Sequence, residues 1–165
     1  MMIAGASLPA ADKPVAGAQP AGRDTTTGRV FEKMIEAALK QGGYSVNGQS
    51  QVGTRPNGGK HMVDLVARKG DTAILISLKW QQSGGTAEQK IPYEIICLSE
   101  ALAQSKQTPG PAGTFNKACI VMGGDGWTLR EWYLSGALKK HLPASKEVDL
   151  YSVDTFIANA NKGKL

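Results

Sequence analysis

Two apolar segments joined by a tight turn limit what this chain can fold into more than any other feature. Residues 62–67 read Met-Val-Asp-Leu-Val-Ala, residues 73–79 read Ala-Ile-Leu-Ile-Ser-Leu-Lys, and a Lys-Gly-Asp turn lies between them. Apolar runs this continuous are typical of strands that are covered on both faces. We therefore expect two successive strands inside an α/β domain, in which helices flank a central mixed sheet.

The polar side chains in these segments indicate a task beyond packing. Side chains two positions apart in a strand share a face, so Ser77 and Lys79 are expected to point the same way. A buried strand seldom ends in a charged residue without a partner or a function. Asp64, near the start of the other strand, can meet Lys79 at one edge of the sheet. These residues are the leading catalytic candidates.

The arrangement resembles the core of the PD-(D/E)XK nuclease superfamily over residues 28 to 152. Asp64 matches the aspartate of the second strand of that core, and Ser77-Leu78-Lys79 matches the (D/E)-X-K triplet of the third. The resemblance implies a restriction-endonuclease-like core with the order α-β-β-β-α-β.

The segment before the hairpin fits the first helix of this core. Its helical spacing of apolar residues predicts a helix over residues 28–41, and Gly42-Gly43 follow as a stop signal. Family members often carry a glutamate in this helix, which the resemblance assigns to Glu32 as a catalytic residue. A glutamate on the solvated face of an amphipathic helix explains Glu32 equally well.

The chain departs from the family pattern at two positions. Val63 takes the place of the proline, and Ser77 takes the place of the acid in the triplet. A hydroxyl binds Mg²⁺ more weakly than a carboxylate does, so another acid is expected beside Asp64 and Ser77 in the metal site. Some family members supply this acid from the following helix.

That helix is predicted over residues 86–104 and contains two candidate ligands, Glu88 and Glu94. We favour Glu88, because the first turn of the helix lies close to the end of the preceding strand. An acidic residue in the first turn also complements the helix N-terminus, with Thr86 as the cap, and this structural explanation is equally compatible with the sequence.

The resemblance implies a Mg²⁺-dependent DNA endonuclease that hydrolyses phosphodiester bonds, with Mn²⁺ as a substitute. Asp64 and the second acid would hold the ion, and Lys79 would position or activate the attacking water. Gln81, on the same side of the strand, would orient the water or contact phosphate. A homodimer would match the two-fold symmetry of a duplex. The alternatives are a catalytically inactive nucleic-acid-binding or interaction protein and a structure-selective junction resolvase.

The charge of the chain suits a nucleic-acid partner. The formal net charge is +5, and clustered Lys and Arg attract a phosphate backbone. The residues expected to contact DNA surround the hairpin: Arg55, Lys60, Arg68 and Lys69. A loop expected over residues 47–60 would drape over a duplex or serve as an ordinary connection.

Residues 1–27 are rich in Ala, Gly and Pro and are expected to form a disordered tail, which leaves residues 28–165 as the nuclease-like domain. The tail lacks the pattern of a signal peptide, and no apolar run reaches membrane-spanning length, so we expect a cytoplasmic protein. The sequence leaves open whether it serves restriction, repair, recombination, a phage or a mobile element.

The rest of the sequence completes the expected architecture. Cys97 and Cys119 have apolar neighbours and no metal-ligand spacing, so both are expected to be buried free thiols. His61 is expected to be structural or a weak phosphate contact, and Trp80 is expected to pack at the rim of the core. The remaining predicted elements are strands over residues 117–122 and 147–153, a helix over 127–141 and a helical turn over 155–160.

Overall fold

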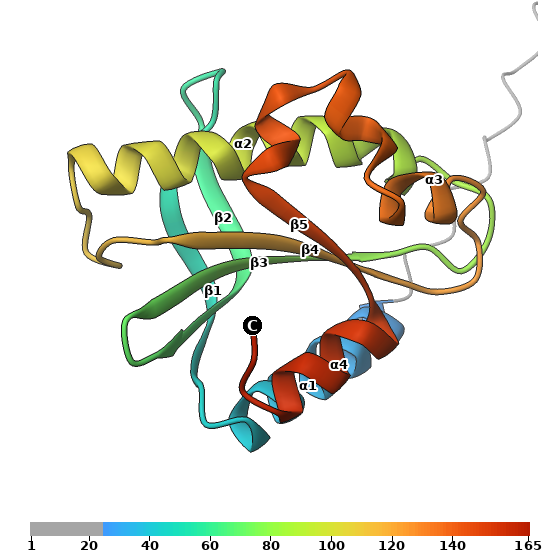
Figure 1. Cartoon of the computed structure of the whole chain (residues 1–165), viewed down its shortest axis with the longest axis horizontal. Coiled ribbons are helices and arrows are strands. Elements are labelled where there is room, and N and C mark those ends of the chain that lie inside the picture. Colours follow the sequence, from blue (N-terminus) through green and yellow to red (C-terminus); the bar gives the residue numbers. More distant parts are fainter. Residues whose placement is uncertain (1–24) are drawn as a thin grey trace, which may run out of the picture.

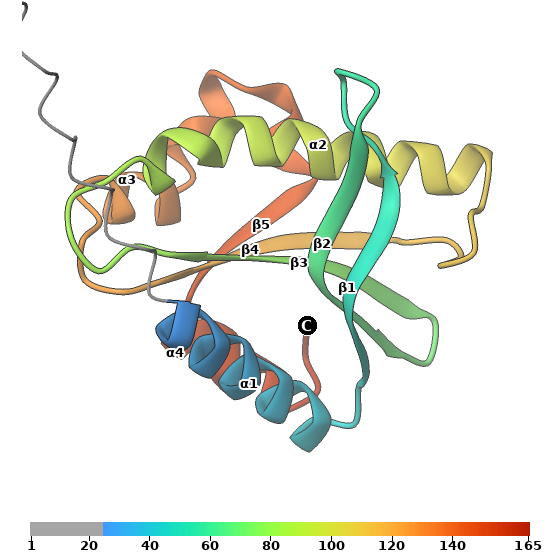
Figure 2. The same cartoon turned by 180° about the vertical axis from the view of Figure 1, so that it is seen from behind.

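A five-stranded mixed sheet lies between two layers of helices in residues 25–165, the part of the chain that the computed structural model describes. Figures 1 and 2 show α1 and α4 on one face of the sheet and α2 on the other. The strands are β1 (Ser45–Thr54), β2 (Lys60–Lys69), β3 (Thr72–Trp80), β4 (Lys117–Gly123) and β5 (Val148–Ser152). The helices are α1 (Thr25–Gln41), α2 (Ala87–Gln107), α3 (Arg130–Leu134) and α4 (Val153–Asn161), with short 3₁₀ turns η1 (Ala137–Lys140) and η2 (Pro143–Lys146). The expected α/β fold and its element order are confirmed.

The strands lie in chain order, β1-β2-β3-β4-β5. The first three are antiparallel, and β3, β4 and β5 are parallel to one another. The expected hairpin forms, with Leu65 opposite Ile76 and Lys69 opposite Thr72. Gly70 in its turn has φ +55°, a conformation that glycine adopts without strain. Helix α2 then makes the crossover that a parallel neighbour of β3 requires.

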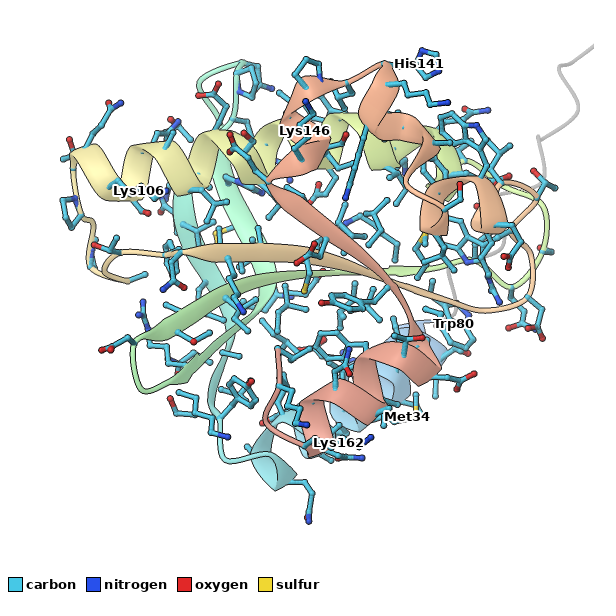
Figure 3. The ribbon with its side chains drawn as sticks, viewed as in Figure 1. Met34, Trp80, Lys106, His141, Lys146 and Lys162 are labelled. Atoms are coloured by element: carbon cyan, nitrogen blue, oxygen red, sulfur yellow. The ribbon has the colours of Figure 1, made fainter. Side chains whose placement is uncertain are left out.

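The core is divided by the sheet into two apolar layers. Leu75 packs with the residues of α2, whereas Ile74 and Ile76 pack with those of α1 and α4. This alternation explains why β3 is apolar on both faces. Cys97 and Cys119 are buried free thiols, as expected. Trp80 packs against the Phe31 ring with centroids 5.2 Å apart, as expected for the core rim, and Figure 3 shows it beside α1 and α4.

Two segments in the N-terminal part of the described chain have a different secondary structure from the one that the sequence predicted. Residues 47–60 are mostly β1 and a short turn, not a loop. Strand β1 pairs only with β2 and is largely exposed, so its polar sequence lacks the alternation that identifies a strand. Helix α1 begins at Thr25, within the segment expected to be a tail. The rest of that expected tail, residues 1–24, lies outside the described residues.

The helix predicted over residues 127–141 is wrong as a single element. Helix α3 ends at Leu134, and Gly136 has φ +77°, which turns the chain before η1 begins at Ala137. The predicted strands correspond to β4 and β5, and the predicted terminal turn is the longer helix α4, whose first turn is capped by the Ser152 hydroxyl accepting from the Thr155 N–H. Among the described helices, none has the length and apolar character needed to cross a membrane.

Candidate active site

Strand β2 changes face at Asp64. Val63 and Val66 both pack in the layer under α2, whereas Leu65 packs on the α1 side, so the regular alternation is broken between them. The paired register with β3 begins at Leu65, and beyond it the Leu78 N–H donates to Asp64 Oδ2 at 2.6 Å. The backbone N–H of Leu78, the middle residue of the (D/E)-X-K-like triplet, therefore holds the Asp64 side chain in place.

Ser77 and Lys79 point to the same side of β3, as expected from strand alternation. Lys79 Nζ donates to Ser77 Oγ at 2.6 Å and lies 3.7 Å from Glu94 Oε1. Glu94 comes from the middle of α2 and is buried, as is Ser77. The structure therefore joins an acid from the helix to the serine and the lysine of the triplet.

The carboxylates of Asp64 and Glu32 lie close enough to repel each other. Burial raises the pKa of Asp64; the Leu78 N–H and Lys79 lower it, and the charge of Glu94 raises it further. Burial and the charge of Asp64 also raise the pKa of Glu32. Gly48 of β1 faces this pair, since a Cβ there would lie 3.7 Å from Glu32 Oε1. Burial is the main cause of both raised pKa values, and the neighbouring carboxylates add to it.

Glu94 is ionised despite its burial. Burial alone would raise its pKa, but His61, Lys79 and the Ser77 hydroxyl together lower the pKa of Glu94 to about 2. The carboxylate is therefore negatively charged at neutral pH, as a ligand of a divalent cation must be.

Sequence reasoning assigned His61 only a structural role or a weak phosphate contact. Its side chain is fully buried, and its Nε2 lies 3.8 Å from Glu94 Oε1. Strand alternation is the sequence signal that could have placed His61 near α2. His61 and Val63 are two positions apart, so their side chains share the face of the sheet that α2 covers.

Glu88 and Gln81 are engaged with the backbone instead of the triplet. The Glu88 carboxylate accepts from the N–H groups of Thr128 and Leu129 and from the Thr128 hydroxyl, and these hydrogen bonds, that of Leu129 first, lower its pKa. Gln81 Nε2 donates to the Gly126 carbonyl, and its Oε1 accepts from the Ala87 N–H. The geometry therefore favours Glu94 over Glu88 as the acid beside Ser77, the reverse of our sequence preference.

The four basic residues expected around the hairpin occupy two separate places. Arg55 lies in the turn between β1 and β2, Lys60 is the first residue of β2, and the Arg55 guanidinium lies 6.0 Å from the Tyr93 ring centroid. Arg68 and Lys69 lie at the opposite, turn end of the hairpin. Arg68 donates to the carbonyls of Ala112 and Thr114, and Lys69 donates to those of Gly42 and Gly163. These hydrogen bonds connect the turn of the hairpin to other segments of the chain and lie away from the triplet.

The donor groups fit an open Mg²⁺ site better than a closed cage. Mg²⁺ usually takes one or two carboxylates and completes its octahedron with water and substrate phosphate. Asp64 and Glu94 supply two carboxylates whose charges act on each other, with Lys79 and Ser77 beside Glu94. Within residues 25–165, no three His, Cys, Asp or Glu side chains gather closely enough to enclose an ion. A Mg²⁺ ion bound by these two carboxylates would take its remaining ligands from solvent and substrate.

Comparison with known proteins agrees with the fold. A family model described as a PD-(D/E)XK nuclease superfamily domain matches residues 23–164. The chain is also similar to the crystal structure of a protein of unknown function, AF1548, with 11% identity and a TM-score of 0.44 over 74% of this chain and 58% of that one. The chain thus spans less than two thirds of that protein, and no curated protein matches it. Because the family model covers almost all of the described residues, the chain belongs to the PD-(D/E)XK nuclease superfamily.

Proposed function

We propose that this chain is a metal-dependent endonuclease that hydrolyses phosphodiester bonds in DNA. The observation that supports this most directly is the position of Lys79, which lies 3.7 Å from Glu94 Oε1 and lowers the pKa of Asp64. A lysine between two carboxylates, at the end of a buried strand, suits phosphoryl chemistry better than packing. Superfamily membership supports a nucleic-acid substrate.

Asp64 and Glu94 are the carboxylates that would hold Mg²⁺, or Mn²⁺ in its place, with Glu32 close behind Asp64. When bound, the ion would polarise the phosphate and lower the pKa of a coordinated water. Ser77 supports Lys79 in this arrangement, because its hydroxyl oxygen accepts a hydrogen bond from Lys79 Nζ at 2.6 Å.

The protein's own part in the reaction is to position charge. The Leu78 N–H holds Asp64 Oδ2, which leaves Oδ1 for a ligand. Lys79 is partly exposed and borders a surface pocket of about 350 Å³ that residues 78–87 and Lys90 line. A phosphate beside the Lys79 ammonium group would be stabilised by its charge as negative charge develops on the phosphate oxygens, and the same group would orient the attacking water.

Cleavage of supercoiled plasmid tests the proposal. We expect nicking that requires Mg²⁺ or Mn²⁺ and that falls roughly 100-fold or more in Lys79→Met, because the charge at the developing oxyanion is lost. Lys106→Met is the matched control, since Lys106 is exposed on α2 and lies far from Trp80, the neighbour of Lys79, in Figure 3. Equal nicking by the wild type and Lys79→Met would overturn the proposed site.

A catalytically inactive nucleic-acid-binding or interaction protein is the second candidate. The observation that favours it is that Lys79 Nζ already lies 3.7 Å from Glu94 Oε1, so the lysine charge partly neutralises this carboxylate without a metal. No cleavage of plasmid, branched DNA or RNA, together with DNA binding in EDTA, would select this candidate. Preferential cleavage of four-way over linear substrates would select a junction resolvase instead, and would require a test for a homodimer.

A further inference from the structure

Packing alone does not explain why a histidine is buried at position 61. Its side chain has an exposed fraction of 0%, and within residues 25–165 neither ring nitrogen has a hydrogen-bond partner. Buried polar atoms in folded proteins are almost always paired, because an unpaired one loses its hydration without compensation. An apolar side chain would fill the same space at a lower cost.

The structure places the carboxylate of Glu94 beside this imidazole. His61 Nε2 lies 3.8 Å from Glu94 Oε1, and Lys79 Nζ lies 3.7 Å from the same oxygen. Nitrogen groups from the start of β2 and the end of β3 therefore converge on one oxygen of a helix residue. Both of these contacts are made to Oε1.

The unusual origin of the acid explains why such support is needed. In this chain Ser77 occupies the strand position of the triplet acid, and Glu94 reaches the site from α2. A glutamate has three side-chain torsions to fix, and a carboxylate that is free to rotate binds a metal more weakly than one that is held in place. Two contacts on Oε1 would restrict the rotation of the group and direct Oε2 to the metal.

We propose that His61 is a positioning residue that holds Glu94 in the orientation needed to bind the divalent metal. This inference rests on the proposed function, since it assigns a role toward the metal of the same site. At 3.8 Å the contact is longer than a hydrogen bond. Hydrogen bonds at catalytic sites often shorten when ligands bind. Replacing a residue that orients a metal ligand typically weakens metal binding by roughly 10- to 100-fold.

A pair of substitutions with similar shape separates this role from packing. His61→Gln keeps an N–H donor at a position close to that of Nε2, whereas His61→Met has a similar length and no donor. We expect Mn²⁺ binding, measured by electron paramagnetic resonance without DNA, to weaken roughly 10- to 100-fold in His61→Met. His61→Gln should bind Mn²⁺ nearly as well as the wild type. The Tm of metal-free His61→Met should equal or exceed that of the wild type.

The outcomes distinguish this inference from the proposed function. The wild type should bind Mn²⁺, and Asp64→Asn should not; failure of the wild type to bind overturns both the function and the role of His61. Wild-type affinity in His61→Met, when Asp64→Asn has lost binding, overturns the role of His61 alone. An equal loss of affinity in both His61 variants, with an equal fall in Tm, would also overturn it, because a packing role predicts that result.

Discussion

At the scale of single residues, the positions of the strand residues in the site could be predicted from the sequence. The positions of the helix residues could not. Ser77 and Lys79 share a face because they are two positions apart, and the sequence was sufficient to predict this. The sequence favoured Glu88 over Glu94, whereas the geometry favours Glu94. The partners of Glu88, Thr128 and Leu129, lie some 40 residues further along the chain, so no local pattern reveals them.

The rise of the helix is a second reason why the sequence did not identify Glu94. Glu94 is six residues beyond Glu88, which at 1.5 Å per residue places it about 9 Å further along α2. The distance from the helix start suggested Glu88, but α2 runs across one face of the sheet (Figure 2), and Glu94 is the acid that meets Lys79. Only the packing of the helix on the sheet determines which acid meets Lys79.

The ionisation of Glu94 leads to a prediction about stability and pH. Its pKa falls from the ordinary 4.5 to about 2 in the folded chain, so folding favours the charged form. The sign of the effect follows: this stabilisation is complete above about pH 4.5 and is lost as the pH falls toward 2. We expect the unfolding free energy in EDTA, from urea titrations, to decline more steeply over this range in the wild type than in Glu94→Gln. Glu100→Gln, an exposed acid on the same helix, should keep the wild-type slope. Parallel profiles for the wild type and Glu94→Gln would contradict the prediction.

At the scale of elements, predictability depended on whether an element is apolar on both faces. Strands β3 and β4 carry continuous apolar runs and were recognised from the sequence. Strand β1 is an edge strand with mostly exposed side chains, and its Gly, Gln and Asn residues indicated a loop. Its ladder with β2 supplies the stability that its side chains do not. The segment of α3 and η1 was predicted as one helix because its apolar residues outweighed the glycine between them.

Two glycines offer a matched test of this account. Gly136 has φ +77°, and a Cβ there would meet only the Lys139 side chain at ordinary contact distance, so the backbone alone should oppose alanine. Gly28 lies exposed in α1 with open space around it. We expect Gly136→Ala to lower the unfolding free energy by about 1 kcal/mol. Gly28→Ala should raise it by about 0.5–1 kcal/mol. Urea titration measures both, and the same sign for both would show that conformation at Gly136 does not end the helix.

At the scale of the whole molecule, a chain with formal net charge +5 brings the carboxylates of Asp64 and Glu94 close enough to act on each other. The basic surface would attract a polyanion, while Asp64 and Glu94 would repel a phosphate until a cation joins them. Arg68 and Lys69 show that net charge alone does not locate a nucleic-acid surface, because both are occupied with backbone carbonyls. Composition therefore predicts the class of partner but not the contact residues.

Metal binding should consequently be visible in the stability of the entire fold. Burial and Glu94 raise the pKa of Asp64, so its ionised form opposes folding until a cation is present. A ligand that binds only the folded chain at 100 times its Kd stabilises it by about 2.7 kcal/mol, and for a chain of 165 residues this corresponds to about 5–10 °C in Tm. We expect this rise with Mn²⁺ in the wild type.

The control for this prediction is Asp64→Asn, whose amide oxygen can still accept from the Leu78 N–H while the buried charge is absent. In EDTA its Tm should match or exceed that of the wild type, because the removed charge was unfavourable in the folded state. In Mn²⁺ its Tm should stay unchanged. Differential scanning calorimetry of both proteins, with and without Mn²⁺, measures the two effects together. A rise of the same size in Asp64→Asn would place the metal elsewhere on the molecule and remove Asp64 from the proposed site.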